Sequence, residues 1–112
     1  MPRSAGDAAP REYLARGQWP DGDLRGDAPV SAVYGQAFSV RLRQALAERG
    51  NPSLREAERE AGVSRKTVER TLRGEVLPDF GAMARLESWL GTGLWPGTEL
   101  RGEQGAGESI KG

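Results

Sequence analysis

Residues 53–74 read SLREAEREAGVSRKTVERTLRG and predict two short helices joined by a tight turn. Ser53, followed three residues later by Glu56, forms a capping box, which marks the start of a helix. That helix is expected to end at Gly62, because glycine tolerates the left-handed conformation that terminates helices. Ser64 is suited to cap the second helix, which follows immediately.

Both predicted helices are amphipathic. The first, expected over 54–61, has an inward face of mostly small residues, so that another helix can approach it closely: Leu54, Ala57 and Ala61. The second, expected over 65–73, turns Val68 and Leu72 inward and three basic residues outward: Arg65, Lys66 and Arg70. This layout is typical of a helix-turn-helix, which places its second helix in the major groove of DNA.

The same residues resemble the lambda-repressor-like (Xre/Cro-type) DNA-binding family. The likeness rests on AGVS at 61–64, SRKTVERTLRGE at 64–75 and Pro78, while DFGAMARLESWLG at 79–91 looks like the next helix of that family. It covers roughly residues 37–94, about half of the chain. The resemblance implies an all-α, lambda repressor-like helix-turn-helix domain of four to five short helices, here with disordered tails.

Two residues depart from the pattern of that family. Glu58 stands where the family usually has an alanine packed against the second motif helix, and a buried unpaired carboxylate is costly. We therefore expect Glu58 to lean outward or to pair with a nearby arginine, Arg70 being one candidate. Thr71 replaces a larger aliphatic residue. These departures concern the packing of the helices and leave the motif intact.

The resemblance also implies contacts with base edges by the first residues of the second motif helix and by one residue a turn later. Carried over to this chain, these are Arg65, Lys66 and Arg70. Arginine and lysine donate to guanine O6 and N7, so a GC-containing half-site is expected. Thr67 is a further candidate, for a thymine methyl group or a phosphate. The alternative is a solvated helix end for the first two residues and an ion pair for Arg70.

Phosphate contacts are expected from the helix N-termini of the motif and from the arginines around it. A serine hydroxyl at a helix N-terminus suits an anion. The candidates are Arg43, Ser53, Arg55, Ser64 and Arg73. For each arginine the alternative is a solvated surface side chain. Phosphate contacts set the register and the affinity of the complex, and they do not select the sequence.

The composition limits the other classes of function. The chain of 112 residues has no cysteine and no histidine, so disulfides, thiolate metal sites and the commonest general base are absent. We expect no catalytic residue, metal or cofactor, and therefore no enzyme. The formal net charge is zero, but residues 38–74 carry nine Arg and Lys against five Glu, about +4. Such a local field is what attracts a protein to phosphates.

Three parts are expected along the chain. Residues 1–30 form a mostly disordered arm, 31–96 form the DNA-binding domain, and 97–112 form a disordered tail. Within the arm, REYLAR at 11–16 hints at a short turn of helix. The alternative is that the large apolar residues of the arm dock on a partner or back on the domain: Tyr13, Leu14 and Trp19.

Two more helices are expected in the domain. One begins between Ser31 and Ala37 and runs to Arg49, and the other follows an N-cap at Asp79 and ends near Leu90. A short fifth element is expected after it: Leu94, Trp95 and Pro96.

These features predict a sequence-specific DNA-binding transcriptional regulator, most simply a repressor, that reads double-stranded DNA with the helix over 65–73. Its expected partners are duplex DNA and, on a palindromic site, a second copy in a weak homodimer. The alternative is a protein-interaction adaptor or an antitoxin-type component that binds a protein partner through its N-terminal arm. The sequence has no apolar run long enough to span a membrane, so a cytoplasmic, nucleoid-associated protein is expected.

Overall fold

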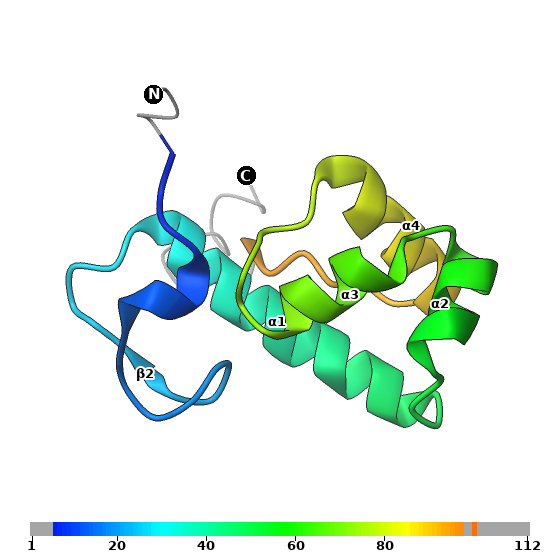
Figure 1. Ribbon diagram of the computed structural model, residues 1–112, viewed down its shortest axis with the longest axis horizontal. Coiled ribbons are helices and arrows are strands. Elements are labelled where there is room, and N and C mark those ends of the chain that lie inside the picture. The colour runs from blue at the N-terminus through cyan, green and yellow to red at the C-terminus, as the bar shows by residue number, and fades with distance from the viewer. Residues whose placement is uncertain (1–5, 98–99, 101–112) are drawn as a thin grey trace, which may run out of the picture.

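The computed structural model describes residues 6–97 and residue 100. Within these residues the chain is mainly helical, with four α-helices preceded by a 3-10 helix and a two-stranded antiparallel hairpin (Figure 1). The elements are η2 (Pro10–Tyr13), β1 (Leu14–Arg16), β2 (Asp23–Leu24), α1 (Val30–Glu48), α2 (Leu54–Ala61), α3 (Arg65–Leu72) and α4 (Phe80–Leu90). The expected disordered tail over 97–112 lies, apart from residues 97 and 100, outside the described residues.

The helix boundaries follow the local signals in the sequence. Ser53 accepts a hydrogen bond from the Glu56 N–H at 3.0 Å, and Ser64 accepts one from the Thr67 N–H at 3.1 Å. Between them, Gly62 adopts a left-handed conformation with φ of 79° and ends α2. The predicted N-cap at Ser53, C-cap at Gly62 and N-cap at Ser64 are therefore confirmed, whereas the reciprocal half of the capping box, from the Ser53 N–H to the Glu56 carboxylate, is not seen among the described residues.

The longest helix, α1, lies across the molecule beneath α3 (Figure 1). It begins at Val30, one residue before the predicted interval, and it ends where Gly50 and Asn51 adopt positive φ angles. One face of α1 is buried at the helical spacing: Phe38, Ser39, Leu42 and Leu46. The other helices pack against this face of α1.

The core joins α1, α3, α4, the turn after α2 and the segment after α4, and Leu54 and Ala61 of α2 pack against it. It comprises Phe38, Leu42, Leu46, Val63, Val68, Ala82, Leu86 and Leu94. Val63, in the turn between α2 and α3, is buried. Thr71 is also buried, and its carbonyl oxygen accepts a hydrogen bond from the Ser39 hydroxyl at 2.9 Å. The bond joins α3 to α1 through the backbone of Thr71, whereas the Thr71 hydroxyl is buried without a hydrogen-bond partner among the described residues.

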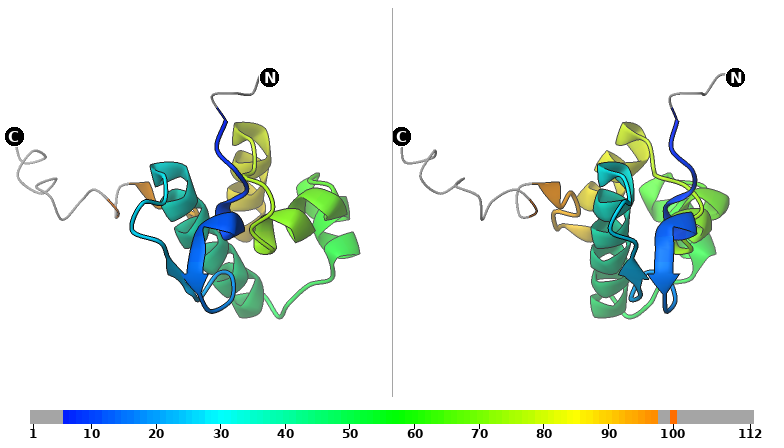
Figure 2. Two further views of the ribbon diagram at one scale, coloured as in Figure 1. Left: turned by 60° about the vertical axis from the view of Figure 1, so that its left-hand side comes forward. Right: turned by 90° about the vertical axis from the view of Figure 1, so that its left-hand side faces the viewer.

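The structure corrects the expectation of a mostly disordered arm for residues 6–29. The 3-10 helix and the hairpin pack beside α1 and the end of α3 (Figures 1 and 2). The Arg11 N–H donates to the Gly74 carbonyl at 3.0 Å, and the Trp19 ring lies on the Cα of Gly74. Trp19 therefore packs back on the helical domain, which was the alternative to a disordered arm.

A second contact holds the same segment on α1. Pro10 is buried against Gly35, where an added Cβ would lie 3.3 Å from the Cγ of Pro10. Two bonds from the Gln36 amide group reach carbonyl oxygens in the loop between the strands, those of Pro20 at 2.9 Å and Gly22 at 2.8 Å. Residues 6–29 and the four helices therefore form one packed unit.

Among the described residues, no helix combines the length and the apolar character required to cross a membrane.

We predict that Gly74→Ala destabilises the fold more than Gly50→Ala does. Both glycines have positive φ, 73° and 87°, so alanine is strained at either position by about 1–2 kcal/mol. At Gly74 the new Cβ would also lie 2.5 Å from the Trp19 ring, whereas at Gly50 no atom lies within 4 Å. Overpacking of this kind costs a further ~1–3 kcal/mol. Urea unfolding of the two variants measures the difference.

A third variant assigns that difference to the ring. In a Trp19→Ala background the added methyl group has room, so Gly74→Ala should then cost no more than Gly50→Ala. Equal costs of the two glycine substitutions in the wild-type background would show that the Trp19 contact does not constrain the fold.

Candidate nucleic-acid interface

The exposed face of α3 is the best candidate for a binding surface. Val68 and Thr71 anchor the other face of the helix in the core. Arg65, Lys66 and Arg70 are exposed, and Thr67 is half-buried. Three predicted base-contact residues therefore project from one short helix whose opposite side is fixed.

The first cation of α3 is paired with a carboxylate from α2. The Arg65 Nε atom lies 2.9 Å from the Glu58 Oε1 atom, and the two side chains remain 52% and 45% exposed. Glu58 thus leans outward and pairs with an arginine, but its partner is Arg65 rather than the suggested Arg70. An exposed pair of this kind contributes about 0.2–1 kcal/mol, so another anion can displace the carboxylate at small cost.

Three other predicted contact residues have no such partner. In the described part of the chain, no carboxylate lies within ion-pair distance of Arg55, Lys66 or Arg70. All three side chains are exposed. They are the cations that can approach a nucleic acid without first leaving an intramolecular pair.

A groove between α2 and α3 brings several predicted residues together. It is lined by Leu54, Arg55, Glu58, Ser64, Arg65, Lys66 and Glu69. Ser64 is already engaged there, since its hydroxyl donates to Thr67 Oγ1 at 2.9 Å and caps α3. Ser53 is exposed at the start of α2, and its Oγ atom caps that helix. The side chains of both serines are therefore occupied in capping the helices. A phosphate would be bound by the backbone N–H groups at the N-termini of α2 and α3.

The other two predicted phosphate contacts are held by carboxylates. Arg73 lies 2.9 Å from Glu69 and 3.8 Å from Glu75. Arg43 makes a bidentate pair with Asp21 of the hairpin loop, at 2.8 Å and 2.9 Å. This hydrogen-bonded guanidinium holds the pKa of the Asp21 carboxyl below its usual value. The structure therefore joins Arg43 to the hairpin and does not bring it to the groove between α2 and α3.

Sequence reasoning missed the role of Asp21 because it treated the surrounding segment as disordered. The only local signal was the turn sequence Pro20-Asp21-Gly22, which gives no indication of a partner 22 residues away. The segment over 6–29 is acidic overall, with five Asp and Glu against three Arg. The N-terminal segment therefore does not extend the cationic surface that α3 presents.

The described residues contain no candidate metal centre. Over 6–97 and at 100, no group of three or more His, Cys, Asp or Glu side chains is placed to hold a metal ion. Comparisons of the chain with family models, with curated proteins and with solved structures found no match.

We predict that Ser64→Ala destabilises the protein by about 1 kcal/mol, because it removes the side-chain acceptor for the Thr67 N–H at the start of α3. Ser88→Ala is the matched control, since Ser88 is exposed within α4 and a surface substitution there changes stability by less than about 0.5 kcal/mol. Thermal or urea unfolding monitored by circular dichroism compares the two. Equal effects would show that the cap does not stabilise α3.

Proposed function

We propose that this protein is a sequence-specific DNA-binding transcriptional regulator, most simply a repressor. It is built on a lambda repressor-like helix-turn-helix domain, in which α2 and α3 are the motif and α3 enters the major groove. The observation that carries the proposal is the combination of an exposed, cationic α3 with a buried opposite face. A helix that reads base edges needs both properties, because it must be held rigidly by one side while it presents donors on the other.

The geometry of the motif supports this proposal. Two capped helices of eight residues each are joined by a turn whose first residue, Gly62, is left-handed and whose second, Val63, is buried. This short connection fixes the direction of α3 relative to α2. A helix-turn-helix depends on that fixed direction, since α2 crosses the DNA backbone while α3 lies in the groove.

The proposed contacts divide into two classes. Arg65, Lys66 and Arg70 would donate to guanine O6 and N7, with Thr67 beside them. The N-termini of α2 and α3 together with Arg55 would bind phosphates and fix the register. Arg43 and Arg73 would join only after leaving their carboxylates, so the complex should have moderate affinity. A regulator of this kind acts on the nucleoid, in the cytoplasm.

We predict that Arg65→Glu/Lys66→Glu abolishes specific DNA binding. Each lost donor pair costs about 1–3 kcal/mol, and the new carboxylates are repelled by phosphate, so the affinity should fall by about 100-fold or more. The measurement is fluorescence anisotropy with the duplex that the wild-type protein enriches from a random pool, repeated over a series of salt concentrations. Wild-type affinity should fall steeply as salt rises.

The matched control is Arg16→Glu/Arg25→Glu. It changes the net charge by the same amount, but both residues lie in the N-terminal segment and are paired with Asp23 and Asp27. It should weaken binding only slightly. If the random pool yields no enriched motif, or if the two double variants bind equally, then α3 does not read DNA. An adaptor function would then explain the fold better.

We also predict that Glu58→Gln raises the affinity for the same duplex several-fold. The carboxylate competes with DNA for the Arg65 guanidinium, and the amide keeps the shape of the side chain while removing its charge. Stability should change by no more than about 1 kcal/mol, because the pair is exposed. A decrease in affinity would instead mean that Glu58 orients Arg65 for binding.

A further inference from the structure

The exposed face of α3 carries one carboxylate among its cations. Glu69 follows Arg65 by four residues and Lys66 by three, so helical periodicity places it on the same face. All three residues line the groove between α2 and α3. The Glu69 side chain is 44% exposed, whereas Val68 and Thr71 on the other face of the helix are buried. A nucleic acid that meets Arg65 and Lys66 therefore also meets Glu69.

A series of ion pairs holds this carboxylate in place. Arg73, four residues later, lies 2.9 Å from it, between the Nη2 and Oε2 atoms. Arg73 also lies 3.8 Å from the Glu75 carboxylate, and Arg11 of the N-terminal segment lies 3.4 Å from the same carboxylate. The ion pairs therefore run from the N-terminal segment to the exposed face of α3, where Glu69 is the last member.

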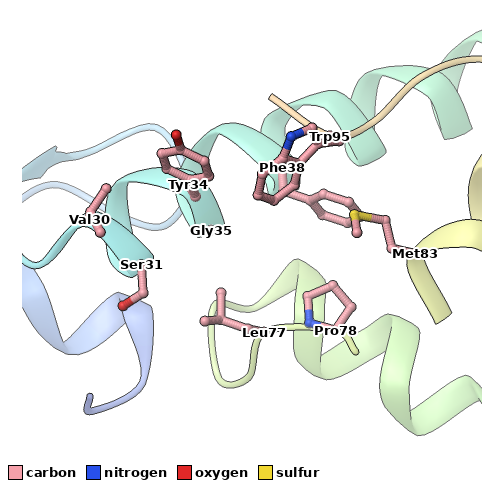
Figure 3. Close-up of a pocket in the computed structure, with 9 residues that line it drawn as sticks. All are labelled: Val30, Ser31, Tyr34, Gly35, Phe38, Leu77, Pro78, Met83 and Trp95. Atoms are coloured by element: carbon pink, nitrogen blue, oxygen red, sulfur yellow. The ribbon is translucent and has the colours of Figure 1, made fainter. Parts of the chain in front are cut away.

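The loop after α3, which carries Glu75, is anchored on α1. The Glu75 side chain is only 27% exposed. Leu77 lies against Gly35 of α1, where an added Cβ would come 2.7 Å from the Leu77 Cδ2 atom. Figure 3 shows Leu77 and Pro78 facing side chains of α1 across the apolar pocket that they line. The ion pairs that end at Glu69 therefore start from packed parts of the molecule.

A carboxylate on this face has a restricted choice of partners on DNA. It has only acceptor oxygens, so phosphates and the acceptor atoms of base edges, such as guanine O6 and N7 or thymine O4, repel it. The donors in the major groove are the amino groups at cytosine N4 and adenine N6. Adenine presents the N7 acceptor beside its donor, which suits the amide group of Gln or Asn and not a carboxylate. Cytosine is therefore the base that fits Glu69.

We propose that Glu69 selects cytosine in the half-site by accepting a hydrogen bond from the N4 amino group, and that Arg73 positions its carboxylate. This inference rests on the proposed function, because α3 must lie in the major groove. One helical turn rises about 5.4 Å and one base-pair step about 3.4 Å. The cytosine is thus one or two base pairs from the guanine bound by Arg65 or Lys66.

The acidic residue gives up affinity for selectivity. A carboxylate that faces a polyanion weakens binding to every duplex that offers it no donor, and it restores binding on the one that does. On such a site Arg73 stays with Glu69 and does not join the phosphate contacts. The half-site is then defined by a repulsive element as well as by the donors of Arg65 and Lys66.

Binding-site selection from random duplex DNA, with the full-length wild-type, Glu69→Gln and Glu69→Ala proteins, tests the proposal. The three motifs should differ at one position, where the wild-type protein selects cytosine, Glu69→Gln selects adenine and Glu69→Ala selects no base. Fluorescence anisotropy on duplexes that differ only there should show a wild-type preference for cytosine of about 10- to 100-fold. An exposed ion pair contributes little stability, so these variants should fold.

Two further variants separate selection from charge and from positioning. Glu48→Gln removes the same charge from an exposed position at the end of α1, so it should change no position of the motif. Arg73→Gln should lower the preference for cytosine several-fold and leave the preference for guanine unchanged. A cytosine preference that survives intact in Arg73→Gln would overturn the positioning role of Arg73.

The failure of this inference can be told apart from the failure of the proposed function. If the motifs of Glu69→Gln and Glu69→Ala match the wild-type motif at every position, Glu69 only pairs with Arg73, and the proposed function stands. The same conclusion follows if the wild-type motif lacks a cytosine one or two base pairs from its guanine. A wild-type protein that enriches no motif would instead refute the proposed function, and this inference with it.

Discussion

The packing of α3 on α1 is the constraint on which the rest of this structure depends. Val68 is fully buried in the core, and the Ser39 hydroxyl of α1 binds the carbonyl oxygen of Thr71. Because α3 has only eight residues, it would not be stable in isolation and takes its stability from these contacts. A helix held along one side in this way can expose cations on the other without losing its orientation. The proposed recognition of DNA is therefore a consequence of burial as much as of charge.

The two ends of α3 are held by different contacts. The contacts at its C-terminal end come from the segment over 6–29, which precedes the four helices. At the N-terminal end, Ser64 caps the helix within its own motif. At the C-terminal end, Gly74 is covered by Trp19 and bonded through its carbonyl oxygen to the Arg11 N–H, so the N-terminal segment supports the helix from outside. Removing that segment would expose the C-terminal turn of α3 and loosen its attachment to the rest of the molecule. The segment is thus a structural support for the candidate interface.

The sequence contained enough information for the helices but not for the N-terminal segment. Caps act within three or four residues, so Ser53, Gly62 and Ser64 could each be recognised from their neighbours alone. The strands β1 and β2 have three and two residues, too few to show an alternating pattern, and the Trp19–Gly74 contact joins residues 55 apart. The candidate site shows the same division. The exposure of Arg65, Lys66 and Arg70 could be predicted from helical periodicity. The ion pairs Glu58–Arg65 and Asp21–Arg43 could not, because they depend on distances that only the folded chain defines.

The ion pairs between these arginines and their carboxylates are sensitive to ionic strength but not to changes of pH near neutrality. The pKa of Asp21 is lowered by its bond to Arg43, so the carboxylate stays charged throughout the neutral range and the pair persists there. The stabilising effect of such a depressed pKa is present above the unfolded value and is lost only as the pH falls through the folded value, in acid. Changes of pH near neutrality therefore do not release Arg43. Phosphate and salt ions can do so, because an exposed pair is screened and exchanged at little cost. To contact DNA in the proposed complex, Arg65, Arg73 and Arg43 would each have to exchange a carboxylate for it, whereas Arg55, Lys66 and Arg70 have no carboxylate to leave. Ionic strength, rather than protonation, would set the balance of this exchange.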